Sequence, residues 1–245
     1  MNWQINIQDK IKIIRMSDGK ANAIDLQFQD KMNSELNQDG SFKGVIITGD
    51  GGFFSAGLNI VNLLQSDRET ITKTLIGLMN LFQNIMTHPL PFIAIVNGHA
   101  VAGGCMLALS CDYRIGIPGK YKMGVNELAL GVDLPPMALA ALRKCVPVKR
   151  LFEVTALGNL YQPNEAVEIG FLNVLDDEES AMSLAMDKMK HLTYSPEPFQ
   201  RLKNRLIQPE LHKIKDESDS IEEFVDQWYS AETQAKVKTA VEKLK

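Results

Sequence analysis

The stretch PFIAIVNGHAVAGGCMLALSCDYRI, residues 91–115, sets the pattern of the whole chain. It opens as an apolar run typical of a buried strand, turns at Gly103 and Gly104, and continues as an apolar helix before the next strand. Earlier in the chain, FFSAGLNI at residues 53–60 makes a second glycine-containing turn after another apolar run. Each turn leaves backbone N–H groups unpaired, because the first N–H groups of a helix have no preceding carbonyl to which they donate.

The same alternation of short apolar runs and longer helical patterns continues on both sides of these turns. Strands are predicted at residues 11–16, 42–49 and 113–117, and helices at residues 25–38 and 67–87. A chain that alternates strand and helix in this way predicts an α/β fold with parallel strand pairing.

The character of the chain changes after residue 190, where it becomes helical and charged. We therefore divide it into a core at residues 1–190 and a C-terminal helical region at residues 191–245. Near the C-terminus, apolar residues recur at helical spacing, namely Ile221, Phe224, Val225 and Trp228. These side chains pack either on the chain's own core or on a neighbouring subunit, and the sequence leaves both alternatives open.

Composition excludes several classes of partner. The 245 residues carry a net charge of −4 and no basic stripe, so we expect no nucleic-acid partner. The longest apolar run falls far short of the roughly 18 residues typical of a membrane span, so we expect no membrane partner. Three cysteines without a pairing pattern, and no targeting segment, favour reduced thiols in the cytoplasm. The histidines do not cluster, and the cysteines lack metal-ligand spacing, so no metal site is expected.

The two turns direct attention to the N–H groups of Leu58 and Gly103, each of which begins a new segment. Gly57 permits backbone angles that other residues resist. Two converging N–H donors form an oxyanion hole, in which one donor stabilises a developing oxyanion by roughly 2.7–4 kcal/mol. From spacing alone, a pair of ordinary strand-to-helix turns is the simpler interpretation.

The residues themselves are more specific than their spacing. FSAGLNI followed by NGHAVAGGCMLALSCDYRI resembles the crotonase superfamily, the enoyl-CoA hydratase/isomerase family. The resemblance extends to ANAID (21–25) and EAVEIGFLNVL (165–175). It implies a spiral of ββα units with a C-terminal helical region that assembles homotrimers or dimers of trimers. It also implies an acyl-CoA thioester as substrate, with coenzyme A as part of that substrate and no separate cofactor.

The resemblance further implies where the substrate binds. The thioester carbonyl would accept hydrogen bonds from the N–H groups of Leu58 and Gly103. Other substrate contacts would come from residues beside the two turns and from the adenine-side segment, namely Ala21, Ala23, Ser55, Ala56, Gly57, Gly104 and Met106.

Hydratases of this family carry two glutamates, and only one of the two positions is a glutamate here. Glu127 is present, whereas Met106 occupies the other position, and its thioether can neither donate nor remove a proton. A single carboxylate suits the movement of a double bond, because one group can remove a proton at the α-carbon and return it at the γ-carbon. An apolar pocket would raise the pKa of that carboxylate. The expected wall of this pocket comprises Leu58, Met106, Leu128, Leu130 and Leu134.

The sub-patterns FSAGLN, AGGCMLALSCDYRI and GVNELALG look like the Δ3,Δ2-enoyl-CoA isomerase branch. This predicts an enzyme that shifts a double bond from the 3 to the 2 position of an enoyl-CoA, with Glu127 as its acid and base. The alternatives are another activity of the superfamily (a hydratase, a CoA-thioester hydrolase or a decarboxylase) or a catalytically silent CoA-binding subunit.

Five further residues have weaker claims to a functional role. Asp133 is more readily explained as a turn residue before two prolines, and His99 as a turn or surface histidine. The family also implies lysines near the CoA phosphates, for which Lys20, Lys243 and Lys245 are candidates without assignment.

Overall fold

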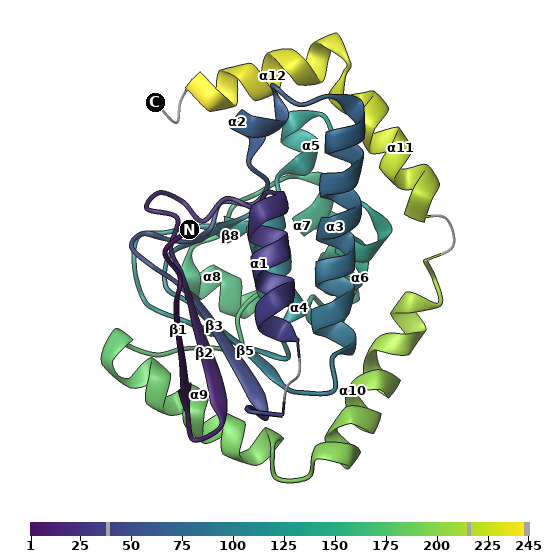
Figure 1. Cartoon of the computed structure of the whole chain (residues 1–245). Coiled ribbons are helices and arrows are strands. Elements are labelled where there is room, and N and C mark those ends of the chain that lie inside the picture. The colour runs from purple at the N-terminus through teal and green to yellow at the C-terminus, as the bar shows by residue number, and fades with distance from the viewer. Residues whose placement is uncertain (38–39, 215–216, 243–245) are drawn as a thin grey trace.

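The computed structural model describes residues 1–37, 40–214 and 217–242 (Figure 1). A larger sheet has the strand order β1-β2-β3-β5-β7-β9, and a smaller sheet has the order β4-β6-β8. The larger sheet contains β1 (Gln4–Gln8), β2 (Ile11–Met16), β3 (Gly44–Gly49), β5 (Phe92–Val96), β7 (Tyr113–Gly116) and β9 (Val174–Leu175). The smaller sheet contains β4 (Phe53–Ser55), β6 (His99–Val101) and β8 (Met123–Gly124).

Strands enter the two sheets in pairs along the chain. The first strand of each pair (β3, β5, β7) joins the larger sheet, and the strand that follows (β4, β6, β8) joins the smaller one. Apart from the antiparallel β1–β2 pair, the strands of both sheets pair in parallel, as the alternation of elements predicts. The chain therefore repeats a ββα unit.

Helices follow these strand pairs and then form the C-terminal third of the chain (Figure 1). In chain order they are α1 (Leu26–Leu36), α2 (Ile60–Leu63), α3 (Arg68–Thr87), α4 (Gly103–Ser110), α5 (Glu127–Leu130), α6 (Pro136–Cys145), α7 (Val148–Ala156), α8 (Pro163–Glu168), α9 (Glu178–Leu192), α10 (Pro196–Leu211), α11 (Glu217–Trp228) and α12 (Ala231–Glu242).

Consecutive side chains of a central strand are buried on opposite faces of the larger sheet. Val45 and Ile47 belong to the main core cluster, whereas Ile46 packs with Ala185 and Met189 of α9. This alternation follows from the period of two residues along a strand. Both faces of the sheet are therefore covered, as expected for parallel strands rich in β-branched residues.

The elements predicted from the sequence are present with small shifts at their ends. The strand predicted at residues 11–16 is β2, and the one predicted at residues 42–49 begins at Gly44. The predicted helix at residues 67–87 is α3, which begins after an N-cap at Asp67. The strand β1 and the small sheet lie outside the predictions. Every residue of β1 is exposed, so no buried face marks it in the sequence.

The C-terminal helices pack on their own chain. α10 contacts α3 and α6, α11 contacts α3, and α12 contacts α2 and α5. Phe224 and Trp228 are buried in one cluster with Leu75 of α3, which settles the alternative left open by the sequence for these two side chains. Tyr229 is 45% exposed. The predicted division at residue 190 falls within α9, which packs against β5 and β7.

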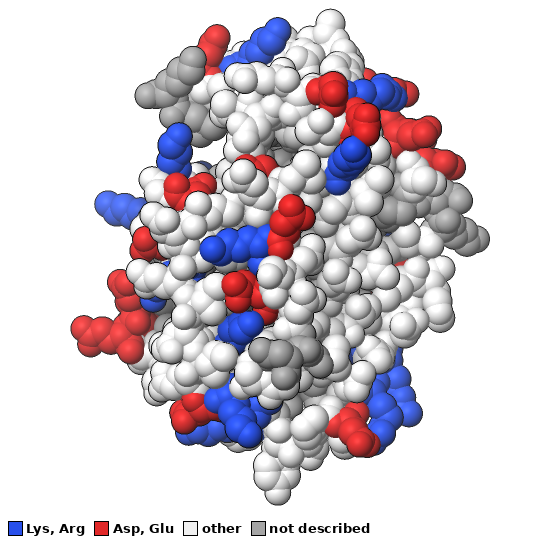
Figure 2. Space-filling view, viewed as in Figure 1, with Lys and Arg blue, Asp and Glu red and all other residues white. Residues whose placement is uncertain are grey.

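The surface carries charges of both signs. On the face shown in Figure 2, acidic and basic side chains are interspersed over most of the molecule. None of the helices in the described part of the chain is long and apolar enough to cross a lipid bilayer.

Candidate functional site

The smaller sheet brings three chain segments to one edge. Its strands β4, β6 and β8 run in parallel, so the residues that follow them leave the sheet on the same side. Residues 56–58 follow β4, residues 102–104 follow β6, and residues 125–127 follow β8. The carboxyl edge of a parallel sheet is where α/β proteins commonly bind ligands. The two glycine turns and Glu127 are thus placed together by strand pairing.

The first turn is held by the segment at residues 21–24. The N–H of Ala56 donates to the carbonyl of Ala21 at 2.9 Å, and the N–H of Ile24 donates to the carbonyl of Gly57 at 2.7 Å. Gly57 has φ of +81°, a left-handed conformation that favours glycine. Its own N–H donates to Oγ of Ser55 at 3.2 Å. The N–H of Leu58, however, has no acceptor among the described residues.

Ser55 links the same two segments from beneath the turn. Its side chain is fully buried, and its Oγ donates to the carbonyl of Asn22 at 2.7 Å. Together with the backbone contacts of Ala21 and Ile24, this hydrogen bond makes the predicted CoA-side residues Ala21 and Ala23 direct neighbours of the first turn. Both alanines are partly exposed.

The second turn is built differently. Ala102, at the N-cap of α4, has φ of +50° and ψ of −125°, which is unfavourable for a residue with a Cβ atom and costs roughly 1–3 kcal/mol. Its N–H donates to the carbonyl of Gly124 at 2.9 Å, which ties the turn to β8. No side chain caps α4, and the N–H of Gly103 has no acceptor in the part of the chain that the structure describes.

The two turns are in contact. A Cβ atom added to Gly57 would lie 2.9 Å from the nitrogen of Gly103, and one added to Gly103 would lie 3.7 Å from the nitrogen of Leu58. A Cβ atom at Gly104 would collide with the carbonyl oxygen of Ser55. The glycines therefore allow a close approach that brings two unpaired N–H groups within a few ångströms of each other.

Glu127 is the first residue of α5, three residues beyond β8. Its Oε2 atom is buried and has no hydrogen-bond partner among the described residues. Burial raises the pKa of this carboxyl group to about 7, although the N–H groups of Glu127 and Asn126 oppose the shift. Burial, and after it the charge of Glu127, raises the pKa of the Cys105 thiol on α4.

The predicted apolar wall is present in part. Met106 is 1% exposed and Leu58 packs against two of the apolar clusters, while Leu130 and Leu134 are partly buried. Leu128 is 44% exposed, so in this chain it does not form a buried wall, contrary to the expectation. The helix α5 spans only four residues, and one of its faces lies outward.

The residues with weaker claims lie in ordinary settings. Oδ1 of Asp133 accepts from the N–H of Leu134 at 2.7 Å, as in a turn. Nδ1 of His99 accepts from the N–H of Lys122 at 3.2 Å, and burial lowers the pKa of this ring. Lys20 is exposed. Lys243 and Lys245 lie outside the described residues.

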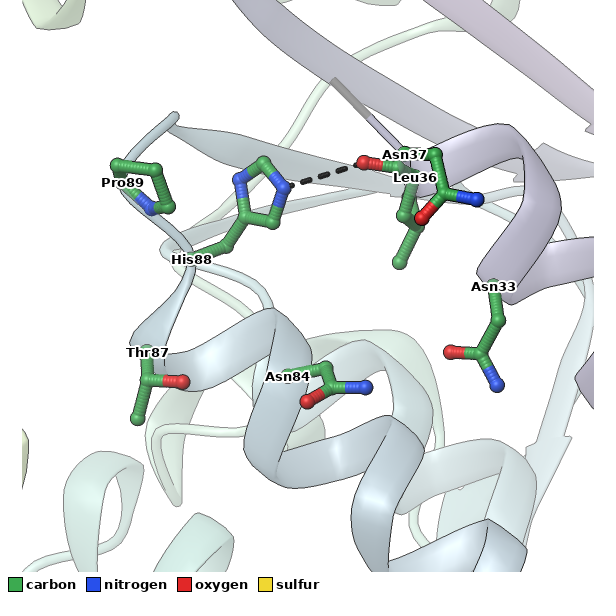
Figure 3. Close-up of a pocket in the computed structure, with 7 residues that line it drawn as sticks. All are labelled: Asn33, Leu36, Asn37, Asn84, Thr87, His88 and Pro89. Carbon is green, nitrogen blue, oxygen red and sulfur yellow. Dashed lines mark hydrogen bonds between the residues drawn. The ribbon is translucent and has the colours of Figure 1, made fainter.

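The structure also contains open hollows that lie away from the turns. One, of about 410 Å³, lies between the ends of α1 and α3 (Figure 3). Its lining includes three asparagines and His88, which donates to the carbonyl of Leu36 at 3.3 Å. Another, of about 510 Å³, is lined by charged residues of α3 and α11. Neither contains a predicted site residue, and neither lining suits a fatty-acyl chain.

Two features of the site escaped the sequence analysis. The first is the strained conformation of Ala102, for which the only sequence signal is an alanine directly before two glycines. The second is Asn126, whose Oδ1 is buried without a partner among the described residues, next to the buried carboxylate. An asparagine before a short helix reads as a cap, yet its side chain makes no capping hydrogen bond.

Comparison with known proteins identifies the family of the chain. The model of the family "Enoyl-CoA hydratase/isomerase" matches residues 6–245. Enoyl-CoA delta isomerase 1, mitochondrial, from Homo sapiens is 27% identical over 202 residues, which cover 80% of this chain and 67% of that protein. A putative enoyl-CoA hydratase from Thermus thermophilus is 28% identical over 176 residues, covering 71% of this chain and 69% of that protein.

Solved structures show the same fold. The crystal structure of human mitochondrial delta3-delta2-enoyl-CoA isomerase matches with a TM-score of 0.92 and 24% identity, covering 100% of this chain and 98% of that chain. This confirms the predicted α/β spiral of ββα units with C-terminal helices. The family match spans nearly the whole chain, and the chain therefore belongs to the enoyl-CoA hydratase/isomerase family.

Proposed function

We propose that this protein is an isomerase that moves a double bond from the 3 to the 2 position of an enoyl-CoA thioester. The observation that carries the proposal is the pairing of one carboxylate, whose Oε2 is buried without a partner among the described residues, with an apolar residue at the second acid/base position. Glu127 lies at the edge of the smaller sheet with the two turns, and Met106 is an apolar residue that cannot transfer a proton.

The reaction needs one proton shuttle and one site for negative charge. The Glu127 carboxylate removes a proton from C2, and the electron pair moves into the thioester carbonyl to give a dienolate. The N–H groups of Leu58 and Gly103 donate to that oxygen. The protonated Glu127 then returns the same proton to C4, which leaves the double bond between C2 and C3. Substrate and product have the same composition, so no water or cofactor enters.

The raised pKa of Glu127 supports this role. A group that must both take and return a proton works best when its pKa lies near the operating pH, and burial brings Glu127 to about 7. A water-adding reaction uses a second group to handle its second proton. Met106 cannot supply one, although the similarity to a protein named as a putative hydratase keeps that reaction as the second candidate.

We also propose that the chain acts as a homotrimer or a dimer of trimers. Apolar side chains stand exposed on two helices that both pack against α6, with Val148 and Phe152 on α7 at 85% and 79% exposure. Leu202 and Leu206 on α10 are 57% and 67% exposed. Patches of this kind favour an interface between subunits. Light scattering should give a mass well above the 27.3 kDa of one chain, and a monomer would contradict this part of the proposal.

The function is tested with a 3-enoyl-CoA of medium chain length. We expect the absorbance of the conjugated thioester to appear without a change in product mass. Glu127→Gln should retain CoA binding and lose about 10²–10⁴-fold in turnover, because the amide cannot act as a base. A gain of one water in the product would instead identify a hydratase. Loss of the thioester would identify a hydrolase, and loss of CO₂ from a carboxylated acyl-CoA a decarboxylase. Unchanged thioesters despite tight CoA binding would identify a silent subunit.

A further inference from the structure

The two ends of α4 differ in their hydrogen bonding to side chains. At its N-terminus no side chain caps the helix, and the N–H of Gly103 has no acceptor within the described chain. At its C-terminus the carbonyls of Ser110 and Cys111 accept from Nζ of Lys144 at 2.9 and 2.8 Å. The carbonyl of Cys111 also accepts from Nη1 of Arg114 at 2.9 Å. Two cationic side chains thus bind the end of the helix opposite the proposed oxyanion hole.

These cations have no carboxylate partner in the described part of the chain. Neither Lys144 nor Arg114 takes part in a salt bridge there, while the nearby Asp112 pairs with Lys203 at 2.8 Å. Arg114 is 4% exposed, and its Nε donates to the carbonyl of Phe171 at 2.9 Å. Burial lowers the pKa of the Lys144 amine. The carbonyls at the helix end are therefore the groups that stabilise these charges, consistent with the negative end of the helix dipole.

The helix α4 connects the C-terminal carbonyls bound by Lys144 and Arg114 to the N–H of Gly103 at its other end. It spans Gly103–Ser110, about 12 Å at 1.5 Å per residue, and each of its residues is buried. Lys144 lies on α6, which packs along α4, and Arg114 lies on β7 of the larger sheet. The helix is thus tied at its C-terminus to two other elements, and its position sets the position of the Gly103 nitrogen.

We propose that Lys144 is a positioning residue for the oxyanion hole. With Arg114, it holds the C-terminus of α4 so that the N–H of Gly103 stays in place against the thioester oxygen. Its positive charge also reinforces the potential that favours an oxyanion at the N-terminus. This inference rests on the proposed function, since it assigns to Gly103 a thioester oxygen.

Lys12 offers a matched control. Its Nζ donates to the carbonyl of Glu35 at 2.7 Å, at the C-terminal end of α1, and the residue is 8% exposed. Like Lys144, it binds a carbonyl at a helix C-terminus, here on a helix that supplies no proposed oxyanion donor, although Lys12 also forms an ion pair with Oε2 of Glu35 at 3.4 Å. The N-cap of α1 is Asp25, whose side chain accepts from the N–H of Phe28, so that helix end is occupied.

The experiment compares Lys144→Met with Lys12→Met in the full chain. With a 3-enoyl-CoA, Lys144→Met should lower kcat by roughly 10- to 100-fold, since small misplacements of catalytic groups have effects of that size. KM should change by less than about threefold, because substrate binding spreads over many other contacts. Lys144→Arg should restore most of kcat. Lys12→Met should leave kcat within about threefold of native.

A second readout is independent of turnover. An aryl-conjugated enoyl-CoA bound to the protein absorbs at longer wavelength when hydrogen bonds polarise its carbonyl, so Lys144→Met should reduce that shift and Lys144→Arg should retain it. Lys144→Gln, which removes the positive charge but keeps an N–H donor group on a shorter side chain, serves if the methionine variant does not fold. An unchanged kcat and an unchanged shift in folded Lys144→Met, or in Lys144→Gln where the methionine variant does not fold, would overturn the inference, as would an equal loss in Lys12→Met. Inactivity of the native protein with a normal spectral shift would count against the isomerase alone.

Discussion

The two turns and the short helix α5 supply the two halves of the proposed site by different means. At the turns, contact between backbones places the unpaired N–H groups of Leu58 and Gly103 beside each other. At α5, the decisive property is the surroundings of Glu127, whose Oε2 is buried without a partner in the described chain. Turnover should therefore respond to added side-chain volume at the turns. At α5, it should respond to the charge of residue 127 and to pH.

Among changes at the two turns, the largest effect is expected from a methyl group placed in the first turn. In Gly57→Ala the new Cβ atom would lie 2.7 Å from the carbonyl oxygen of Val101 and 2.9 Å from the nitrogen of Gly103, at a φ of +81°. We expect turnover to fall by about 10²-fold or more, since one oxyanion donor contributes that much. Stability should fall by about 2 kcal/mol, measured by urea unfolding.

The control for that variant is Gly52→Ala. Gly52 precedes the same strand, β4, and an added Cβ atom would meet nothing within 4 Å. It should leave turnover and unfolding unchanged. Equal losses in both variants would show that the loop, rather than the contact between turns, controls activity.

The pH dependence of turnover tests the other half of the comparison. Glu127 must be ionised to remove a proton, and burial raises its pKa to about 7. In the free enzyme, kcat/KM should therefore rise about tenfold per pH unit below about pH 7 and level off above it. A plateau that already begins near pH 5 would show that the carboxylate is not the base or is not buried in solution.

The same burial means that ionised Glu127 should lower the free energy of unfolding. Its pKa is raised from 4.5 in the unfolded chain to about 7, so between these values the folded state binds more protons and the free energy of unfolding decreases as pH rises. The loss is complete above about pH 7 and amounts to about 3 kcal/mol. Glu127→Gln should therefore be more stable than native at pH 8 and similar to it near pH 4. Urea titrations at both pH values check this, and equal stabilities at pH 8 would contradict it.

The smallest effect is expected at the second turn. Ala102 holds φ of +50° despite its Cβ atom, so Ala102→Gly should relieve strain and change the free energy of unfolding by at most about 1 kcal/mol. Turnover should stay near the native value. Ala100→Gly, at a buried position of β6, should destabilise the protein by about 1 kcal/mol without any such relief. A large loss of turnover in Ala102→Gly would show that its methyl group, and not only its backbone, shapes the site.

The sequence predicts the larger sheet better than the smaller one. The strands β2, β3 and β5 contain five or six residues each, mostly apolar, and alternate with helices along the chain. Runs of this length can be recognised as strands from the sequence. The strands β4, β6 and β8 contain two or three residues each, too few for any period. Yet it is their parallel pairing that brings the turns and Glu127 to one edge. Without the family motifs, convergence of these segments could not have been derived.

Within the site, the sequence identifies the functional residues but does not indicate how buried their side chains are. Glu127, Leu58 and Gly103 stand out by motif, but the burial of Oε2 depends on tertiary packing around α5, which contacts the distant helix α12. The exposure of Leu128 was missed for the same reason, since a helix of four residues has no reliable periodic face. The binding of Lys144 to the end of α4 joins residues 33 and 34 positions apart, with no signal in the pattern of charges.

The packing of the last helices has a consequence for the order of events during synthesis. Phe224, Trp228 and Val237 complete the apolar cluster over Leu75, and Oγ1 of Thr233 donates to the carbonyl of Gly131, 102 residues earlier, at the end of α5. Contacts between such distant residues cannot form until both segments have been synthesised. A nascent chain that still lacks residues 221–237 carries both turns and Glu127, yet the neighbourhood of α5 stays uncovered. We therefore expect catalytic competence to arise only when the ribosome has released the final helices.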